Sequence, residues 1–150
     1  MLNVMKLIEV TRKGEEWRVI PCYPNYLVSN LGRVYGTVQN KIEKGEWTYN
    51  GYHRVPLSTD GKAEKKRVSH LVMMAFCEDY TPKKHIHHIN KNRGDDRLDN
   101  LLQLAEEEHR AVHDLYDILG DEYVRSLDGE TLLRMCRFVL HLFSKEGDAA

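Results

Sequence analysis

Histidine spacing is the feature of this sequence that most limits how the chain can fold. Five of its eight histidines lie close together, at His85, His87, His88, His109 and His113. Side chains alternate along a strand, so the adjacent His87 and His88 would point to opposite faces. His109 and His113 are four residues apart, so on a helix they share one face and can supply two ligands to one ion. A strand, a loop, a strand and a helix would therefore bring His87, His109 and His113 together.

Apolar spacing and turn residues predict this order of elements. Short strands separated by turns are expected from Glu16 to Leu57, and the apolar positions after Arg67 predict a helix near residues 68–77. HIHHI predicts a strand, followed by a polar loop and a second strand at LLQL. Three glutamates would open a helix after Ala105, and Gly120 would stop it. A further amphipathic helix is predicted over residues 128–143, with a frayed SKEGDAA tail.

Composition indicates one globular domain, or one domain with a small appendage, since 41% of the 150 residues are hydrophobic and 30% are charged. No run approaches the roughly 18 apolar residues of a membrane span, and the N-terminus lacks a signal-peptide pattern. We therefore expect a cytoplasmic protein with no membrane partner. The three cysteines are isolated, which argues against a disulfide framework or a four-cysteine zinc site and predicts ordinary buried thiols.

The net charge of −1 conceals two parts of opposite sign. Residues 1–97 carry 17 basic and 11 acidic side chains, a charge of +6, whereas residues 98–150 carry 5 basic and 12 acidic ones, a charge of −7. The first part would meet a polyanion such as DNA. Charge alone does not separate this interpretation from solvated surface charge.

The segment from residue 66 to 113 resembles the HNH nucleases, whose strand-strand-helix fold holds a metal ion. The resemblance rests on three short motifs and on the helical segment VSHLVMMAF that precedes them. The motifs are His87-His88-Ile89-Asn90, Asp99-Asn100-Leu101, and Glu108-His109 with a further His113. A second resemblance covers GEEWRVIPCYPNYLVSNLGRVYG, which is similar to the NUMOD4-like module that often precedes the nuclease in phage and intron homing endonucleases. Cys22 departs from the glycine that is common there.

The resemblance implies an α+β fold with four parts along the chain. An N-terminal lead would span residues 1–14 and a small antiparallel β module residues 15–60. The ββα-metal nuclease motif would span residues 61–114 and a C-terminal helical extension residues 115–150. A phage-encoded protein that acts in the host cytoplasm would fit this arrangement.

The resemblance also implies roles for the motif residues. His88 would be the general base that activates water, because a near-neutral pKa suits that task. His87 and His109 would be metal ligands, and His113 a third ligand, as in the histidine-rich version of the motif in bacterial toxin nucleases. Asn100 would brace the loop between the strands and orient His88.

One divalent metal ion and double-stranded DNA are the implied cofactor and partner. Nitrogen ligands suit Zn²⁺, Ni²⁺, Co²⁺ or Mn²⁺ better than Mg²⁺, although Mg²⁺ stays open because the phosphate would complete the site. Basic residues in the first part of the chain and beside the histidines are the candidate DNA contacts. They are Arg33, Arg54, Lys65, Lys66, Arg67, Lys83, Lys84, Lys91, Arg93 and Arg97.

Two other classes of protein remain open. One is a non-catalytic DNA-binding accessory protein in which the metal ion has only a structural role and holds the strands and helix together. His88 argues against it, because a structural site normally closes with four protein ligands and needs no spare base. The other is an adaptor whose acidic C-terminal helix mediates a homodimer or binds a protein partner, although an apolar helix face more often packs on its own domain.

Overall fold

The computed structural model describes residues 1–148, with side chains described to residue 144. Internal contacts divide the chain into two units. The first contains Met1–Thr81 together with Arg93–Leu98, and the second contains Pro82–Asn92 and the chain from Asp99 onwards. The predicted domain boundary at residues 60–61 falls in the turn of a hairpin of the first unit, and the predicted boundaries stay a prediction.

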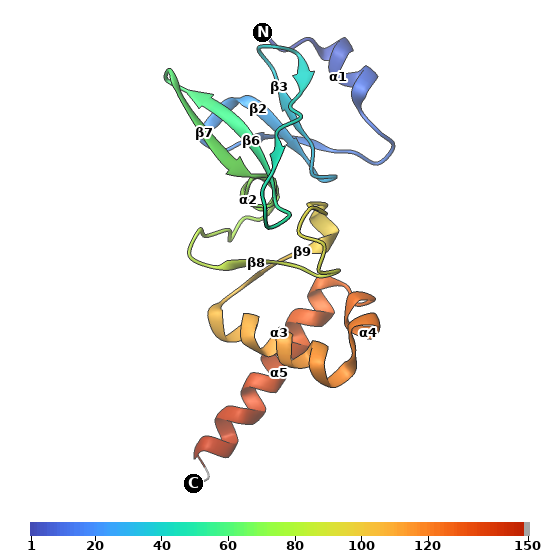
Figure 1. Cartoon of the computed structure of the whole chain (residues 1–150), viewed down its shortest axis with the longest axis vertical. Coiled ribbons are helices and arrows are strands. Elements are labelled where there is room, and N and C mark those ends of the chain that lie inside the picture. The colour runs from blue at the N-terminus through green and yellow to red at the C-terminus, as the bar shows by residue number, and fades with distance from the viewer. Residues whose placement is uncertain (149–150) are drawn as a thin grey trace. The chain divides into compact units, whose positions relative to one another are not determined.

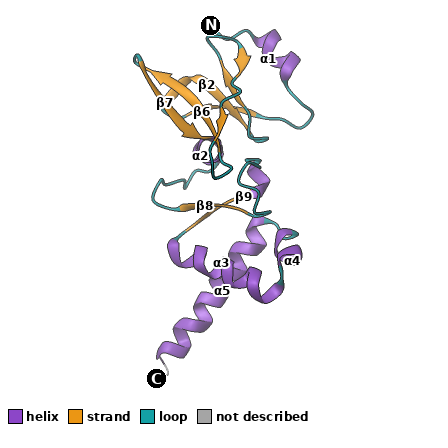
Figure 2. Ribbon diagram, viewed as in Figure 1, coloured by secondary structure: helices purple, strands orange, loops and turns teal. Residues whose placement is uncertain are grey.

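The first unit consists of two antiparallel sheets and two helices (Figures 1 and 2). One sheet has the order β1-β2-β3-β4, with β1 Trp17–Ile20, β2 Tyr23–Ser29, β3 Val34–Gly36 and β4 Lys41–Ile42. The other has the order β5-β6-β7, with β5 Glu46–Trp47, β6 His53–Thr59 and β7 Lys62–Arg67. Helix α1 spans Val4–Val10 and helix α2 spans Val68–Phe76. α2 begins and ends within a residue of the predicted helix, and its apolar residues Leu71 and Val72 are fully buried.

The second unit consists of one strand pair and three helices. Its elements are β8 His85–His88, β9 Leu101–Leu104, α3 Glu106–Leu119, α4 Asp121–Arg125 and α5 Gly129–Asp148, and the short 3₁₀ helix η1 (Leu98–Asn100) leads into β9. β8 and β9 pair antiparallel, with His87 opposite Leu102 and His88 opposite Leu101. The predicted strand-strand-helix order and the α+β class are confirmed.

A buried apolar cluster holds this second unit together. Its members from α3 are Ala111, Val112, Leu115 and Tyr116, and β9, α4 and α5 add Leu104, Val124, Leu132 and Cys136. α3 and α5 pack side by side, as Figure 1 also shows. The apolar face of α5 therefore packs largely on its own unit. α5 runs to Asp148, beyond the residue 143 at which the helix was predicted to end, and the last two residues of the predicted tail lie outside the described part.

The turn between β1 and β2 explains the departure at Cys22. Ile20 pairs with Tyr23, so Pro21 and Cys22 form a two-residue turn, and Cys22 has a φ of +69°. Proline followed by a positive φ is the pattern of a type II turn, in which the second central residue is usually glycine. Cys22 is also exposed, and Cys77 is half-buried, so the prediction of buried thiols is right only for Cys136.

We expect Cys22→Gly to stabilise the protein by about 0.5–1 kcal/mol. The left-handed conformation costs a non-glycine residue roughly 1–2 kcal/mol, and glycine at this position removes that cost. The greater freedom of glycine in the unfolded chain offsets about 0.5–1 kcal/mol of the resulting stabilisation. Urea unfolding would measure the change. Cys22→Ser is the matched control, because it removes the thiol and keeps the unfavourable φ. Equal stability of the two variants would contradict the explanation.

Candidate metal centre

Three histidines converge on the face of α3 that packs on β8. His87 lies on β8 and is buried, His109 lies in the first turns of α3 and is half-buried, and His113 is exposed one turn later. Each offers one ligand atom, and these atoms lie within 4.8 Å of one another. The Nε2 atoms of His109 and His113 are 3.3 Å apart. The structure thus brings together the three residues predicted as metal ligands.

The surroundings of the histidines favour neutral imidazoles. Burial, with smaller contributions from the nearby His109 and His113, lowers the pKa of His87 to about 3. Burial also lowers the pKa of His109, with additional contributions from His113 and His85. A neutral imidazole has a free electron pair for a metal, whereas a protonated one has none. Three imidazole nitrogens fit a divalent transition metal and leave coordination positions for other ligands.

Tyr116 closes the buried side of the cluster. It lies on the same face of α3 as His109 and His113, and it is almost fully buried. Its hydroxyl lies 3.0 Å from Nε2 of His87 and donates to the backbone carbonyl of Ile89. Burial raises the pKa of Tyr116 to about 12, so the hydroxyl stays protonated at neutral pH. Sequence reasoning missed Tyr116, although its spacing of seven residues from His109 was a usable signal.

His88 follows His87 in β8 and projects to the other side of the strand. It is buried, with 5% of its surface exposed. The end of β8 turns back directly after it, since the amide of Lys91 donates to the carbonyl of His88 at 3.0 Å. His88 is therefore held in a short, well-bonded segment next to the histidine cluster.

Asn100 connects the two sides of the loop between β8 and β9. Its Oδ1 accepts from the amide of Asn90 at 2.9 Å, and its Nδ2 donates to Oδ1 of Asn90 at 3.0 Å. Its backbone carbonyl accepts from the amide of Ile89 at 2.9 Å. Three hydrogen bonds thus join Asn100 to the two residues that follow His88.

The basic residues predicted to bind DNA in the first unit already have internal partners. Arg33 is the clearest case, because its guanidinium donates twice to the carbonyl of Val10 and lies 3.5 Å from the buried carboxylate of Glu15. This placement favours a packing role for Arg33. The other contacts are more exposed. Arg54 and Lys65 contact Glu46, Lys66 contacts Glu64, Arg67 and Arg93 lie over the ring of Tyr52, and Arg97 contacts Asp95.

Three more predicted DNA contacts lie in the second unit, close to the histidines in sequence. Lys83 is exposed and Lys84 half-buried, just before β8. Lys91 follows β8, forms an ion pair with Asp121 at 2.9 Å and places its ammonium 4.2 Å from the ring centre of Tyr116.

His85, for which the sequence suggested no role, stacks on His109 with ring centres 4.6 Å apart.

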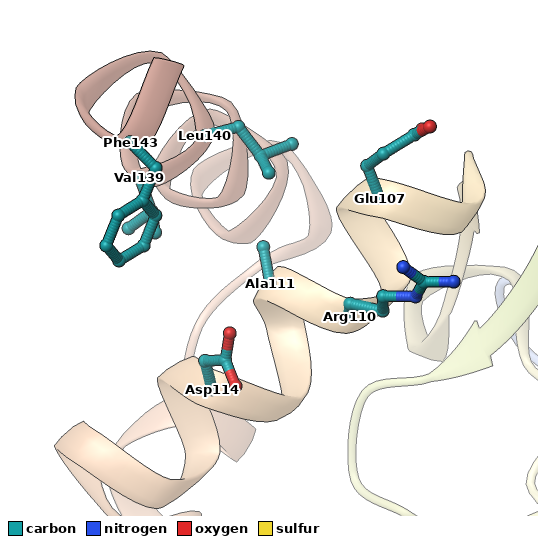
Figure 3. A pocket seen from close by; sticks show the side chains of 7 residues that line it. All are labelled: Glu107, Arg110, Ala111, Asp114, Val139, Leu140 and Phe143. Carbon is teal, nitrogen blue, oxygen red and sulfur yellow. The ribbon is translucent and has the colours of Figure 1, made fainter. Parts of the chain in front are cut away.

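A shallow apolar groove between α3 and α5 is separate from the histidines. It is lined from α3 by Glu107, Arg110, Ala111 and Asp114 and from α5 by Val139, Leu140 and Phe143 (Figure 3). Helical spacing places the α3 residues of the groove on the side opposite His109 and His113. The groove therefore takes no part in the candidate metal centre.

The second unit has the strand-strand-helix architecture of the ββα-metal nucleases, with the histidine cluster between strand and helix. Residues 67–111 match the family model described as HNH endonuclease, and residues 15–58 match that described as NUMOD4 motif. The chain therefore carries a NUMOD4 motif followed by a segment that matches the HNH endonuclease family.

Two phage proteins and one solved structure are similar to this chain. DNA endonuclease I-HmuI of Bacillus phage SP01 is 36% identical over 87 residues, which cover 57% of this chain and 50% of that protein. H-N-H endonuclease F-TflII of Escherichia phage T5 is 31% identical over 100 residues, which cover 65% and 52%. A structure describing DNA binding and cleavage by the HNH homing endonuclease I-HmuI matches with a TM-score of 0.61 and 30% identity, covering 70% of this chain and 60% of that one.

The chain spans about half the length of these two phage relatives. Among residues 1–148, no helix combines the length and apolar character needed to cross a membrane.

Proposed function

We propose that this protein is a metal-dependent endonuclease that hydrolyses phosphodiester bonds of double-stranded DNA. The observation that carries the proposal is the convergence of the His87, His109 and His113 ligand atoms within 4.8 Å, with the buried His88 adjacent in the chain. The names of the phage relatives, one a DNA endonuclease and the other an H-N-H endonuclease, support the same class of reaction. A phage-encoded enzyme acting in the host cytoplasm fits these relatives.

In the proposed site, the three histidines bind one divalent cation through neutral nitrogens. When bound, the cation supplies positive charge that stabilises the scissile phosphate and the leaving oxygen. Three nitrogen donors favour Zn²⁺, Ni²⁺, Co²⁺ or Mn²⁺, and Mg²⁺ remains a candidate because the DNA phosphate would add an oxygen ligand.

His88 is the proposed general base. Its imidazole would take a proton from water as the water oxygen attacks phosphorus, while the bond to the 3′ oxygen breaks and a 5′ phosphate remains. A base must be held at a fixed position to be effective. The hydrogen bonds of Asn100 to Ile89 and Asn90 support its proposed role in positioning His88.

The proposed DNA contacts combine cations from both units. Lys83 and Lys84 precede the histidine strand, and Lys91 follows it. In the first unit, the exposed Lys65 and Arg67 lie on the same lysine-rich strand β7. The ion pairs of Lys65 with Glu46 and of Lys91 with Asp121 are weak enough for phosphates to compete with them, because exposed pairs contribute only about 0–1 kcal/mol. We propose no DNA contact for Arg33, whose guanidinium is turned inward.

Supercoiled plasmid tests the proposal with the full-length chain. We expect conversion to nicked or linear plasmid with at least one of Mg²⁺, Mn²⁺, Co²⁺, Ni²⁺ or Zn²⁺, and none after treatment with EDTA. Agarose gels separate the three plasmid forms. DNA binding without cleavage under every metal would favour the accessory protein with a structural metal ion instead.

A further inference from the structure

The hydroxyl group of Tyr116 contacts one ring nitrogen of His87, a proposed metal ligand. The hydroxyl lies between two groups of β8 and the residue after it, namely Nε2 of His87 at 3.0 Å and the carbonyl oxygen of Ile89. The tyrosine is only 2% exposed, so water does not compete for these contacts.

The number of available hydrogens determines the direction of both hydrogen bonds. A tyrosine hydroxyl has one hydrogen, and a carbonyl oxygen can only accept. The hydrogen of Tyr116 therefore goes to Ile89, and the hydroxyl oxygen can only accept from His87. Nε2 of His87 must then carry its hydrogen, which leaves the free electron pair of the neutral ring on Nδ1.

The geometry points to Tyr116 as a positioning residue that fixes His87 in the Nε2–H tautomer, so that Nδ1 is the atom that binds the metal. This inference rests on the metal site of the proposed function and specifies how that site is built. Ligand histidines commonly donate their other ring N–H to an outer partner, which fixes the ring and its tautomer. Here the outer partner is a tyrosine on the same helix as the two other histidines.

The same hydroxyl also holds the strand end that carries His88. Ile89 directly follows His88, and its carbonyl accepts from Tyr116 while its amide donates to the carbonyl of Asn100. The ring of Tyr116 is itself held by the apolar cluster of α3, α4 and α5 and by the ammonium of Lys91. Tyr116 thus connects the packed core of the second unit to both His87 and the segment beside His88.

Histidine ring spectra of the ¹⁵N-labelled full-length protein test the inference without any variant. In metal-free protein, long-range ¹H–¹⁵N correlations should show His87 with its hydrogen on Nε2. Added Zn²⁺ should shift Nδ1 of His87 while the Nε2 hydrogen persists. A hydrogen on Nδ1 in the metal-free protein, or zinc bound at Nε2, would overturn the inference.

Tyr116→Phe then tests the consequence, since it removes the hydroxyl and keeps the ring. We expect His87 to become a mixture of tautomers and the affinity for Zn²⁺ to fall by about 10–100-fold, the usual cost of losing an outer partner. Tyr35→Phe is the matched control, because Tyr35 is also fully buried and its hydroxyl contacts Asn40 at 3.3 Å in the other unit. An unchanged tautomer and affinity in a folded Tyr116→Phe protein would contradict the positioning role.

The two measurements separate this inference from the proposed function. A wild-type His87 with hydrogen on Nε2 but no Zn²⁺-induced shift at any of the three histidines would contradict the metal site and leave the Tyr116 hydrogen bond standing. Zinc binding with the opposite tautomer would contradict the role of Tyr116 and leave the metal site standing.

Discussion

His88→Ala is expected to lower the rate of DNA cleavage by about 10²–10⁴-fold, the usual contribution of a general base. Metal affinity and DNA affinity should stay close to those of the wild type. His88 follows the ligand His87 in the strand but projects to the other face, and its ligand atoms are not among the group that converges within 4.8 Å. Single-turnover cleavage at saturating metal would measure the change in rate.

Two further variants separate a lost base from a disturbed fold. His88 is buried, so alanine leaves a cavity, and His88→Asn fills most of that space without providing a base of suitable pKa. His88→Ala and His88→Asn should both cleave DNA slowly, and added imidazole should partly restore cleavage by His88→Ala. His141→Ala, at an exposed position of α5, is the control and should cleave normally. Cleavage at the wild-type rate by a folded His88→Ala protein would exclude His88 as the base.

Local patterns predicted the elements that carry the site because they depend on neighbouring residues. The apolar spacing that begins at Val68 gave helix α2, and Gly120, with a φ of +87°, ends α3 at the predicted residue. The alternation of His87 and His88 and the spacing of His109 and His113 were sufficient to place three side chains together once a strand-strand-helix order was assumed. Apolar spacing and turn residues predicted that order, and the resemblance to HNH nucleases agreed with it.

Features that depend on distant contacts were not predictable in the same way. Arg33 was a candidate DNA contact because it is a cation in a basic region, but its partner Val10 is 23 residues away in the chain. Strand β7 was missed because its sequence, KAEKKR, has no apolar alternation, as is common for lysine-rich edge strands. The helix α4 is only five residues long and left no periodic signal.

Local sequence patterns also could not predict that the loop before Asn100 packs with the first unit. Residues 93–98 belong to the first unit although the nuclease motif includes them. The amide of Leu98 donates to the carbonyl of Asn30, and Gly32 approaches the backbone of Asp96 so closely that a Cβ atom would lie 2.9 Å from it. Glycine at this position of the N-terminal module is therefore required by packing against a loop more than 60 residues later in the chain.

His109→Ala is expected to weaken metal binding by at least about 100-fold, since loss of an outer partner alone costs 10–100-fold and this change deletes a direct donor. His109 is half-buried on the surface of α3, so its removal should disturb the fold less than removal of the buried His87. Calorimetric titration with Zn²⁺, or the visible absorption of bound Co²⁺, would measure the affinity. Cleavage should fall at limiting metal and recover in part when metal is raised.

His85 provides the matched control for this experiment. Its ring stacks on His109 at 4.6 Å, so it shares the same surroundings, but it is not part of the group whose ligand atoms converge. His85→Ala should therefore bind metal as the wild type does, whereas His113→Ala should resemble His109→Ala if His113 is the third ligand. Unchanged titrations for both His87→Ala and His109→Ala would rule out the proposed metal centre. A loss in His109→Ala with no loss in His113→Ala would instead leave a site of two histidines, to which water or the DNA phosphate must contribute more of the ligands.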